Sequence, residues 1–472
     1  MTFSSLEYLV FLPIVFILYW TLCKRSKALQ NYLLVAANCV FYAWWDWRFL
    51  GLLLLTDASV FAAGKLMQRY DDDDRKRKRI SAVAIVFNLA ILFYFKYFDF
   101  FIHSFASAFG ITLTDTSTLH ILMPVGISFY TFTAISYCVD VYRRKVAATD
   151  DFAAFFAFLT FFPAILSGPI SRGEKQLPQY LVKRVFDYDK CVAAVKMILI
   201  GALMKFCLAD RLGIYVDAVY SNYEFHNGST LLLATILYTI QVYGDFAGYS
   251  LMAIGSGKLL GIDLPVNFIR PYFSQTIGEF WRRWHVSLST WFRDYLYFPL
   301  GGSRVSRARW AFNIMVVFVV SGLWHGAAFG YIVWGAIHGI SIVVEKYVYG
   351  DKLKKMSNRL SVPYFFHILI TLIIVASSRV FFITHSIGDA LTIFAKIFTE
   401  PGALFTDSNT FILAGISFVI VAIYDCVEEY NLKLRLLSSS NVVVRYATAV
   451  ALLWFILACG VLNNSSFIYF KF

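Results

Sequence analysis

The chain has 472 residues, of which 59% are hydrophobic, 18% aromatic and only 15% charged. Its 42 basic and 30 acidic residues give a formal net charge of +12, and its mean hydropathy is +0.64. Soluble globular domains carry about 25% charged residues. The composition therefore excludes a soluble protein and predicts a polytopic membrane protein.

Apolar stretches recur along the whole chain, and each is long enough to cross a ~30 Å hydrocarbon layer, which takes about 20 residues. They lie near residues 6–23, 30–55, 80–108, 119–142, 152–170, 191–220, 230–255, 310–345, 363–383, 410–427 and 443–462. Because no segment is polar enough for a soluble domain, we predict a single all-α integral membrane domain over residues 1–472, with about 10–12 transmembrane helices.

Seven cysteines are scattered through or beside the apolar stretches, and no C-x-x-C pair occurs. A free thiol in such a place behaves as a small hydrophobic group. The cysteine pattern therefore predicts neither a disulfide framework nor a metal site.

The segment FWRRWHVSLSTWFRDYLYFPLGGSR, residues 280–304, has a helical pattern of aromatic side chains. Offsets of 0, 3, 4, 7, 10, 11 and 14 separate Trp281, Trp284, His285, Leu288, Trp291, Phe292 and Tyr295. This spacing predicts an amphipathic re-entrant or interfacial helix near residues 278–298, with His285 pointing inward. Pro299 ends that helix, and Gly301-Gly302 allow a sharp turn towards Arg304.

The Trp324-His325-Gly326 triplet lies inside the apolar run from Ile314 to Ile342. An ionisable side chain at membrane depth is costly, so His325 is expected to line a cavity or to perform chemistry. Together with His285, it points to general acid/base transfer. The alternative for His285 is a buried histidine bonded to a carbonyl. His338 would lie on another face of a continuous helix, so a structural role is expected for it.

Basic residues gather in short connections, at residues 24–25, 75–79, 143–145, 183–184, 304–309 and 352–355. By the positive-inside rule most of these loops should face the cytoplasm. The alternative is attraction of a polyanionic ligand such as a nucleotide. Arg282, Arg283 and Arg304 fit that alternative best, because they lie near the candidate site.

Several long segments, in order, resemble the membrane-bound O-acyltransferases, specifically the bacterial alginate and peptidoglycan O-acetylation branch. These are FYAWWDWRFL, residues 122–143, FFPAILSGPI, QVYGDFAGYSLMAIGSGKLLGI (residues 241–262), residues 280–304, and SGLWHGAAFGYIVWGAIHG (residues 321–339). The resemblance covers most of the chain. It implies helices around a central tunnel reached from both faces of the membrane.

The resemblance implies that His325 is the active-site histidine, acting as general base, with His285 as its partner. The residues expected to bind substrate are Arg304, near the cytoplasmic mouth, and Arg282, Arg283, Trp324 and Asp245. The implied donor is cytosolic acetyl-coenzyme A, with no permanently bound cofactor and no metal. Implied partners are a periplasmic SGNH-type transferase or esterase, a cell-surface polysaccharide and membrane lipid, but no nucleic acid. The implied location is the bacterial inner (cytoplasmic) membrane, with multiple passes.

The tail FIYFKF, residues 467–472, is a second signal. It is similar to a C-terminal signature of several acetylating members, and to the small peptide partner of the D-alanyl transfer system. Its presence in this chain argues against the D-alanyl branch. The tail is either an aromatic membrane anchor or an acyl relay in which the Tyr469 hydroxyl carries the group covalently.

Other functions compete with O-acetyl transfer. One alternative is transfer of D-alanine or another acyl group to a cell-wall polymer. The others are a transporter, which would show paired repeats or broken helices, and a scaffold for a polysaccharide-modification complex. The residues do not identify the acceptor, which could be alginate, another exopolysaccharide, peptidoglycan or a partner protein.

Overall fold

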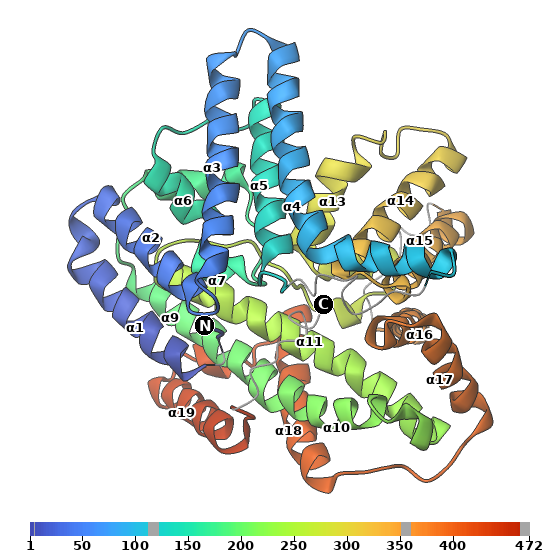
Figure 1. Cartoon of the computed structure of the whole chain (residues 1–472). Coiled ribbons are helices and arrows are strands. Elements are labelled where there is room, and N and C mark those ends of the chain that lie inside the picture. Colours follow the sequence, from blue (N-terminus) through green and yellow to red (C-terminus); the bar gives the residue numbers. More distant parts are fainter. Residues whose placement is uncertain (4, 112–121, 351–359, 463–472) are drawn as a thin grey trace. The chain divides into compact units, whose positions relative to one another are not determined.

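The computed structural model describes residues 1–3, 5–111, 122–350 and 360–462, and the regular secondary structure of this part of the chain is helical (Figure 1). Eight of the described helical segments are long and apolar enough to cross a membrane: Arg48–Arg69, Asp74–Lys96, Tyr188–Tyr220, Gly228–Leu259, Arg307–His325, Val362–Thr384, Ser408–Glu429 and Val442–Cys459. Two shorter apolar segments are Leu6–Thr21 and Phe152–Ile165. The predicted all-α, multi-pass fold is confirmed. The central tunnel and the single domain over residues 1–472 stay predictions.

The described residues group into two compact units, and the first comprises residues 1–195 and 253–265. Its helices are α1 (Leu6–Thr21), η1 (Cys23–Arg25), α2 (Lys27–Ala43), α3 (Arg48–Arg69), α4 (Asp74–Ala108), α5 (Ile127–Tyr142), α6 (Phe152–Leu159), α7 (Phe162–Ile165), α8 (Gly173–Leu181) and the start of α9 (Tyr188–Ala202). In Figure 1, α3 and α4 are the long helices beside α5, and both contact it. Nearly every residue of α5 is buried.

Buried polar side chains of the first unit find partners within it. The Asn38 side chain donates to Thr160 Oγ1 at 2.9 Å and accepts from the backbone N–H of Phe162 at 2.9 Å. These bonds join α2 to the connection between α6 and α7. Because lipid offers no hydrogen bonds, such internal pairing is required of a chain that spans a membrane.

The second unit comprises residues 196–252 and 266–472. Its helices are the rest of α9, η3 (Leu203–Ala209), α10 (Asp210–Tyr220), η4 (Tyr223–Phe225), most of α11 (Gly228–Leu259), η5 (Pro271–Phe273), α12 (Ile277–Arg283), α13 (Val286–Phe292), η6 (Arg293–Tyr297), α14 (Arg307–His325), α15 (Phe329–Tyr349), α16 (Val362–Thr384), α17 (Ile387–Thr399), α18 (Ser408–Glu429), η8 (Leu436–Ser438) and α19 (Val442–Cys459). Both η3 and η6 are π-helical.

The apolar stretch near residues 310–345 forms two tightly packed helices, α14 and α15, so the continuous helix assumed for His325 and His338 is wrong. α14 ends at His325, Gly326 is extended, and α15 begins at Phe329. The two helices approach closely through glycines. A Cβ at Gly322 would collide with the Tyr331 carbonyl oxygen, and one at Gly335 with the Phe318 carbonyl oxygen. Side chains at these positions would force the helices apart.

Candidate active site

The aromatic segment near residues 278–298 does not form the continuous helix predicted from its spacing. It breaks between α12 and α13, where Trp284 is extended and His285 has φ 44° and ψ 53°. A left-handed conformation costs a non-glycine residue about 1–3 kcal/mol, and such residues cluster at active sites and ligand-binding sites. The predicted inward position of His285 is nevertheless observed, since its side chain is fully buried.

The break is held open by backbone pairing with an irregular segment that follows α11. The N–H of Ile269 donates to the Arg283 carbonyl at 2.9 Å, and the N–H of Val286 donates to the Asn267 carbonyl at 2.9 Å. These bonds satisfy backbone groups on both sides of His285 that a continuous helix would have paired internally. The pairing thereby compensates for the strained conformation.

Asn267 also holds the turn through its side chain, which is fully buried. Its Oδ1 accepts from the N–H of Ser287 at 3.3 Å and from the Ser287 hydroxyl at 2.9 Å, while its Nδ2 donates to Ser250 Oγ at 3.2 Å. Sequence reasoning missed this residue. The one signal was a polar side chain in a short segment between two apolar stretches.

An Asn267→Ala variant is expected to lower kcat by up to about 100-fold, because a displacement of about 1 Å at a reacting group can cost that much. Its free energy of unfolding should fall by only about 1–3 kcal/mol for the lost buried hydrogen bonds. The measurement is kcat and KM beside thermal unfolding of the purified protein. A loss of stability with unchanged kcat would mean that Asn267 does not position His285.

His325 is the last residue of α14 and is 4% exposed. Its ring centroid lies 5.0 Å from Trp324, 5.0 Å from Trp334 and 5.4 Å from Phe382. Trp324 also contacts His285, with ring centroids 5.9 Å apart. The structure therefore brings His285, Trp324 and His325 together, as two buried imidazoles packed on one indole.

His285 has a second aromatic neighbour, Phe246 of α11, whose ring centroid is 4.6 Å from that of the imidazole. Burial in these surroundings lowers the pKa of His285, which lies outside the apolar spans, to about 3. The ring is therefore neutral near pH 7. A neutral imidazole has one nitrogen that donates a hydrogen bond and one that accepts, and either can orient a reacting group.

His338 was expected to face away from His325 on a continuous helix, and the break between α14 and α15 removes that reasoning. Both rings pack against Trp334, with centroids 5.0 Å and 5.1 Å from it. His338 Nε2 lies 3.0 Å from Ser378 Oγ, whose hydrogen goes to the Val375 carbonyl at 2.8 Å. Nε2 must then donate to the hydroxyl, so His338 links α15 to α16, which agrees with a structural role.

The three arginines expected to bind substrate differ in their surroundings. Arg283 forms ion pairs with Glu279 at 2.7 Å and Glu429 at 2.8 Å. Arg282 and Arg304 are exposed. Arg304 follows the predicted glycine turn, in which Gly301 and Gly302 have φ values of 104° and 58°. Arg282 and Arg304 are therefore accessible to a ligand, whereas Arg283 joins α12 to α18 through its ion pairs.

Asp245 lies in a buried ion-pair cluster. Lys205 Nζ is 2.6 Å from Asp245 and 2.7 Å from Asp210, and the lysine side chain is 2% exposed. Residues five apart, such as 205 and 210, are about 140° apart around an α-helix. The π-helical turn η3 brings them onto one face. A lysine inside the apolar stretch 191–220 was the signal that sequence reasoning did not use.

The chain belongs to the MBOAT, or membrane-bound O-acyltransferase, family, whose model matches residues 39–378. It is an O-acyltransferase and a multi-pass membrane protein, as predicted. A probable alginate O-acetylase AlgI of Pseudomonas syringae pv. tomato is 35% identical over 439 residues, which cover 92% of this chain and 82% of that protein.

Two further relatives carry other names. The peptidoglycan O-acetyltransferase of Helicobacter pylori is 31% identical over 412 residues, covering 81% of this chain and 77% of the relative. A teichoic acid D-alanyltransferase of Streptococcus thermophilus is 32% identical over 268 residues, covering 52% of this chain and 63% of the relative. The expectation for Tyr469 and the tail 467–472 falls outside the described residues.

Proposed function

We propose that this protein transfers acetyl groups from cytosolic acetyl-coenzyme A to an acceptor outside the cytoplasm, with His325 as general base. The observation that carries the proposal is the pair of buried histidines on Trp324, one of them in a strained turn. The similarity to an alginate O-acetylase and a peptidoglycan O-acetyltransferase supports acetyl as the acyl group. The greater extent of the alginate match favours acetyl transfer to a polysaccharide over D-alanyl transfer to teichoic acid.

In the proposed reaction, His325 takes the proton of an acceptor hydroxyl as its oxygen attacks the thioester carbonyl carbon. The carbon–sulfur bond breaks, and the thiolate leaves with the proton returned by the imidazolium. The position of His325 at the carboxyl end of α14 supports its role as general base, because the carbonyl groups at that end favour the positive charge of the imidazolium. His285, neutral and fixed by its turn, orients the reacting carbonyl or His325.

The proposed location is the bacterial inner membrane, where donor and acceptor meet from opposite sides. The acceptor is either the polysaccharide itself or a periplasmic SGNH-type partner that passes the acetyl group on. The test is transfer of radiolabelled acetyl in proteoliposomes of known orientation. Label should reach an outer-face acceptor only when acetyl-coenzyme A is supplied on the cytoplasmic face. Transfer from a D-alanyl thioester, and none from acetyl-coenzyme A, would contradict the proposal.

An Arg304→Ala variant is expected to raise KM for acetyl-coenzyme A roughly tenfold with little change in KM for the acceptor. An arginine–phosphate hydrogen bond contributes about 1.5–3 kcal/mol, and exposure reduces this. Arg307→Ala, at the start of α14, is the matched control for loss of one exposed charge. Equal effects of the two variants, or extracytoplasmic labelling of Ser303→Cys, would contradict this donor site.

The alternative in which the Tyr469 hydroxyl relays the acyl group has its own test. A Tyr469→Phe variant keeps the ring and removes only the hydroxyl, so the relay predicts lost transfer with normal membrane insertion. Mass spectrometry of the C-terminal peptide after exposure to donor should then show an acetyl adduct on Tyr469 in the parent protein. An active Tyr469→Phe variant, together with no adduct in the parent protein, would contradict the relay. It would indicate direct transfer of the acetyl group to the acceptor with His325 as base.

A further inference from the structure

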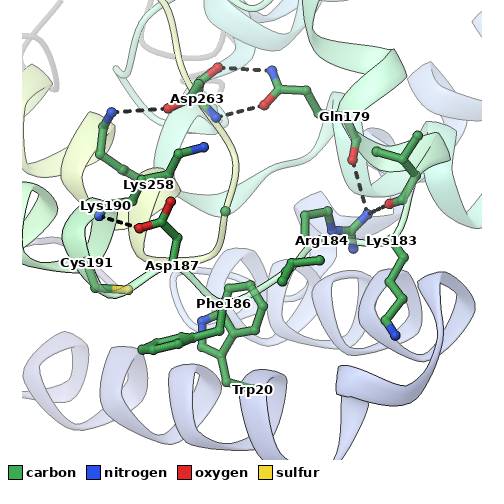
Figure 2. A pocket seen from close by; sticks show the side chains of 13 residues that line it. Trp20, Gln179, Lys183, Arg184, Phe186, Asp187, Lys190, Cys191, Lys258 and Asp263 are labelled. Atoms are coloured by element: carbon green, nitrogen blue, oxygen red, sulfur yellow. Dashed lines mark hydrogen bonds and ion pairs between the residues drawn. The ribbon is translucent and has the colours of Figure 1, made fainter.

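A pocket of about 450 Å³ lies in the first unit, remote in sequence from the two histidines. It is formed by the end of α1, the end of α8 and the start of α9 with the connection between them, and the end of α11 with the residues that follow it (Figure 2). Its lining comprises Trp20, Gln179, Val182, Lys183, Arg184, Val185, Phe186, Asp187, Lys190, Cys191, Lys258, Gly261 and Asp263. The volume falls in the range of small-molecule sites, about 300–1,000 Å³.

The pocket carries an excess of positive charge, with four basic and two acidic side chains in its lining. Asp263 is paired with Lys258 at 3.2 Å. Asp187 Oδ1 accepts a hydrogen bond from the backbone N–H of Lys190 at 3.0 Å, and this bond caps the start of α9 (Figure 2). Both acidic groups therefore have structural roles, and the remaining charge favours an anionic ligand.

Arg184 is the buried part of this positive charge, and its guanidinium donates hydrogen bonds to neutral acceptors. Nε donates to the Tyr19 hydroxyl at 2.6 Å and Nη2 to Asn31 Oδ1 at 2.8 Å. Nη1 donates to the carbonyls of Gln179, Tyr180 and Val182. These neutral acceptors satisfy the N–H groups of the guanidinium but do not neutralise its positive charge. A nearby anion would therefore be stabilised.

The rim of the pocket is apolar and exposed. Val182, Val185 and Phe186 are 59%, 76% and 48% exposed. The Trp20 indole packs 5.5 Å from the Phe186 ring and donates its N–H to the Leu259 carbonyl at 2.9 Å. Exposed apolar and aromatic groups beside lysines are typical of the membrane–water interface, where acyl chains and headgroups meet.

The position along α1 indicates the cytoplasmic interface. The apolar helix ends at Thr21, and the exposed Lys24 and Arg25 follow in η1. Lys183 and Arg184 lie in another short basic connection. By the positive-inside rule both connections face the cytoplasm. Basic pockets between helices on that side are suited to the headgroups of anionic lipids.

We propose that this pocket binds the phosphate of an anionic phospholipid from the cytoplasmic leaflet. Lys190 contacts the phosphate oxygens, the Arg184 charge attracts them, and the acyl chains lie over Val185 and Phe186. Lys183, whose side chain points away from Lys190 (Figure 2), adds positive charge at the edge of the pocket. Free inorganic phosphate has the same anionic chemistry but gains nothing from the apolar rim. The rim therefore selects the lipid.

The test is native mass spectrometry of the purified full-length protein titrated with phosphatidylglycerol or phosphatidylcholine. The Lys183→Gln/Lys190→Gln variant should bind phosphatidylglycerol about thirtyfold more weakly, since each lysine beside an anionic lipid contributes about fivefold. The control variant Lys24→Gln/Lys175→Gln removes the same charge from exposed positions outside the pocket lining. It should bind like the parent protein, as should the pocket variant with phosphatidylcholine.

Three outcomes would overturn the proposal. Equal weakening in both variants would mean diffuse surface charge instead of a site. Equal retention of both lipids by the parent protein would mean no recognition of an anionic headgroup. Displacement of phosphatidylglycerol by an equal concentration of inorganic phosphate would assign the pocket to soluble phosphate. Matching thermal unfolding of the two variants and the parent protein excludes misfolding as the cause of weak binding.

Discussion

A His325→Ala variant is expected to lose acyl transfer by a factor of roughly 10²–10⁴, the usual contribution of a positioned general base. The protein should still fold and insert, because alanine is a good helix former at the end of α14. The measurement is acetyl transfer at saturating donor and acceptor, with thermal unfolding of the same preparation. Activity like that of the parent protein would contradict the assignment of His325 as base.

The matched control is His338→Ala, which removes an equally buried imidazole that packs on the same Trp334 ring. It should cost the hydrogen bond to Ser378 and some stability, but far less activity. His285→Ala should be nearly as harmful to transfer as His325→Ala. Equal loss of activity and of stability in all three variants would indicate misfolding and would not support the site.

A Lys205→Met variant is expected to lower the free energy of unfolding by about 3–5 kcal/mol, the cost of removing one partner from a buried ion pair. Methionine fills most of the volume of lysine, so the effect comes from charge. Asp210 and Asp245, whose side chains are 5% and 3% exposed, would be left without their shared cation. Denaturant titration of the detergent-solubilised protein gives the measurement.

Two further variants separate this electrostatic effect from packing. Lys196 lies in α9 and donates a hydrogen bond to Ser438 in an exposed position. A Lys196→Met variant should therefore change the free energy of unfolding little. Replacing the whole cluster in Lys205→Met/Asp210→Leu/Asp245→Leu should recover much of the lost stability, because apolar groups need no counter-ion. If Lys205→Met were no worse than Lys196→Met, the cluster would not be a buried ion pair.

Loss of the cluster should also reduce acyl transfer, because Asp245 precedes Phe246 on α11. Phe246 packs on the His285 ring. A shift of α11 at this position therefore moves one wall of the imidazole site. The cluster thereby gives Asp245 an expected effect on function through the packing of its neighbour, and its role in substrate binding stays a prediction.

The amino-acid sequence by itself determined the membrane class, the all-α fold and the place of His325 in an apolar run. These properties are local: about 20 apolar residues suffice to define a span, and the cost of a buried imidazole depends on its immediate surroundings. The inward position of His285 was also predicted from helical spacing, but the helix breaks at this residue, so its burial depends on the turn and not on the repeat.

Only the tertiary structure decided how these parts meet. The left-handed turn at His285 depends on backbone hydrogen bonds with residues 267–269. The residue pattern within 280–295 gives no information about these bonds. The close packing of α14 against α15 depends on Gly322 and Gly335, which contact the facing helix. The partner of Asp245 lies 40 positions earlier, at Lys205, on a π-helical turn. Such contacts join residues distant in sequence, so their free energies belong to the folded chain and not to any one segment.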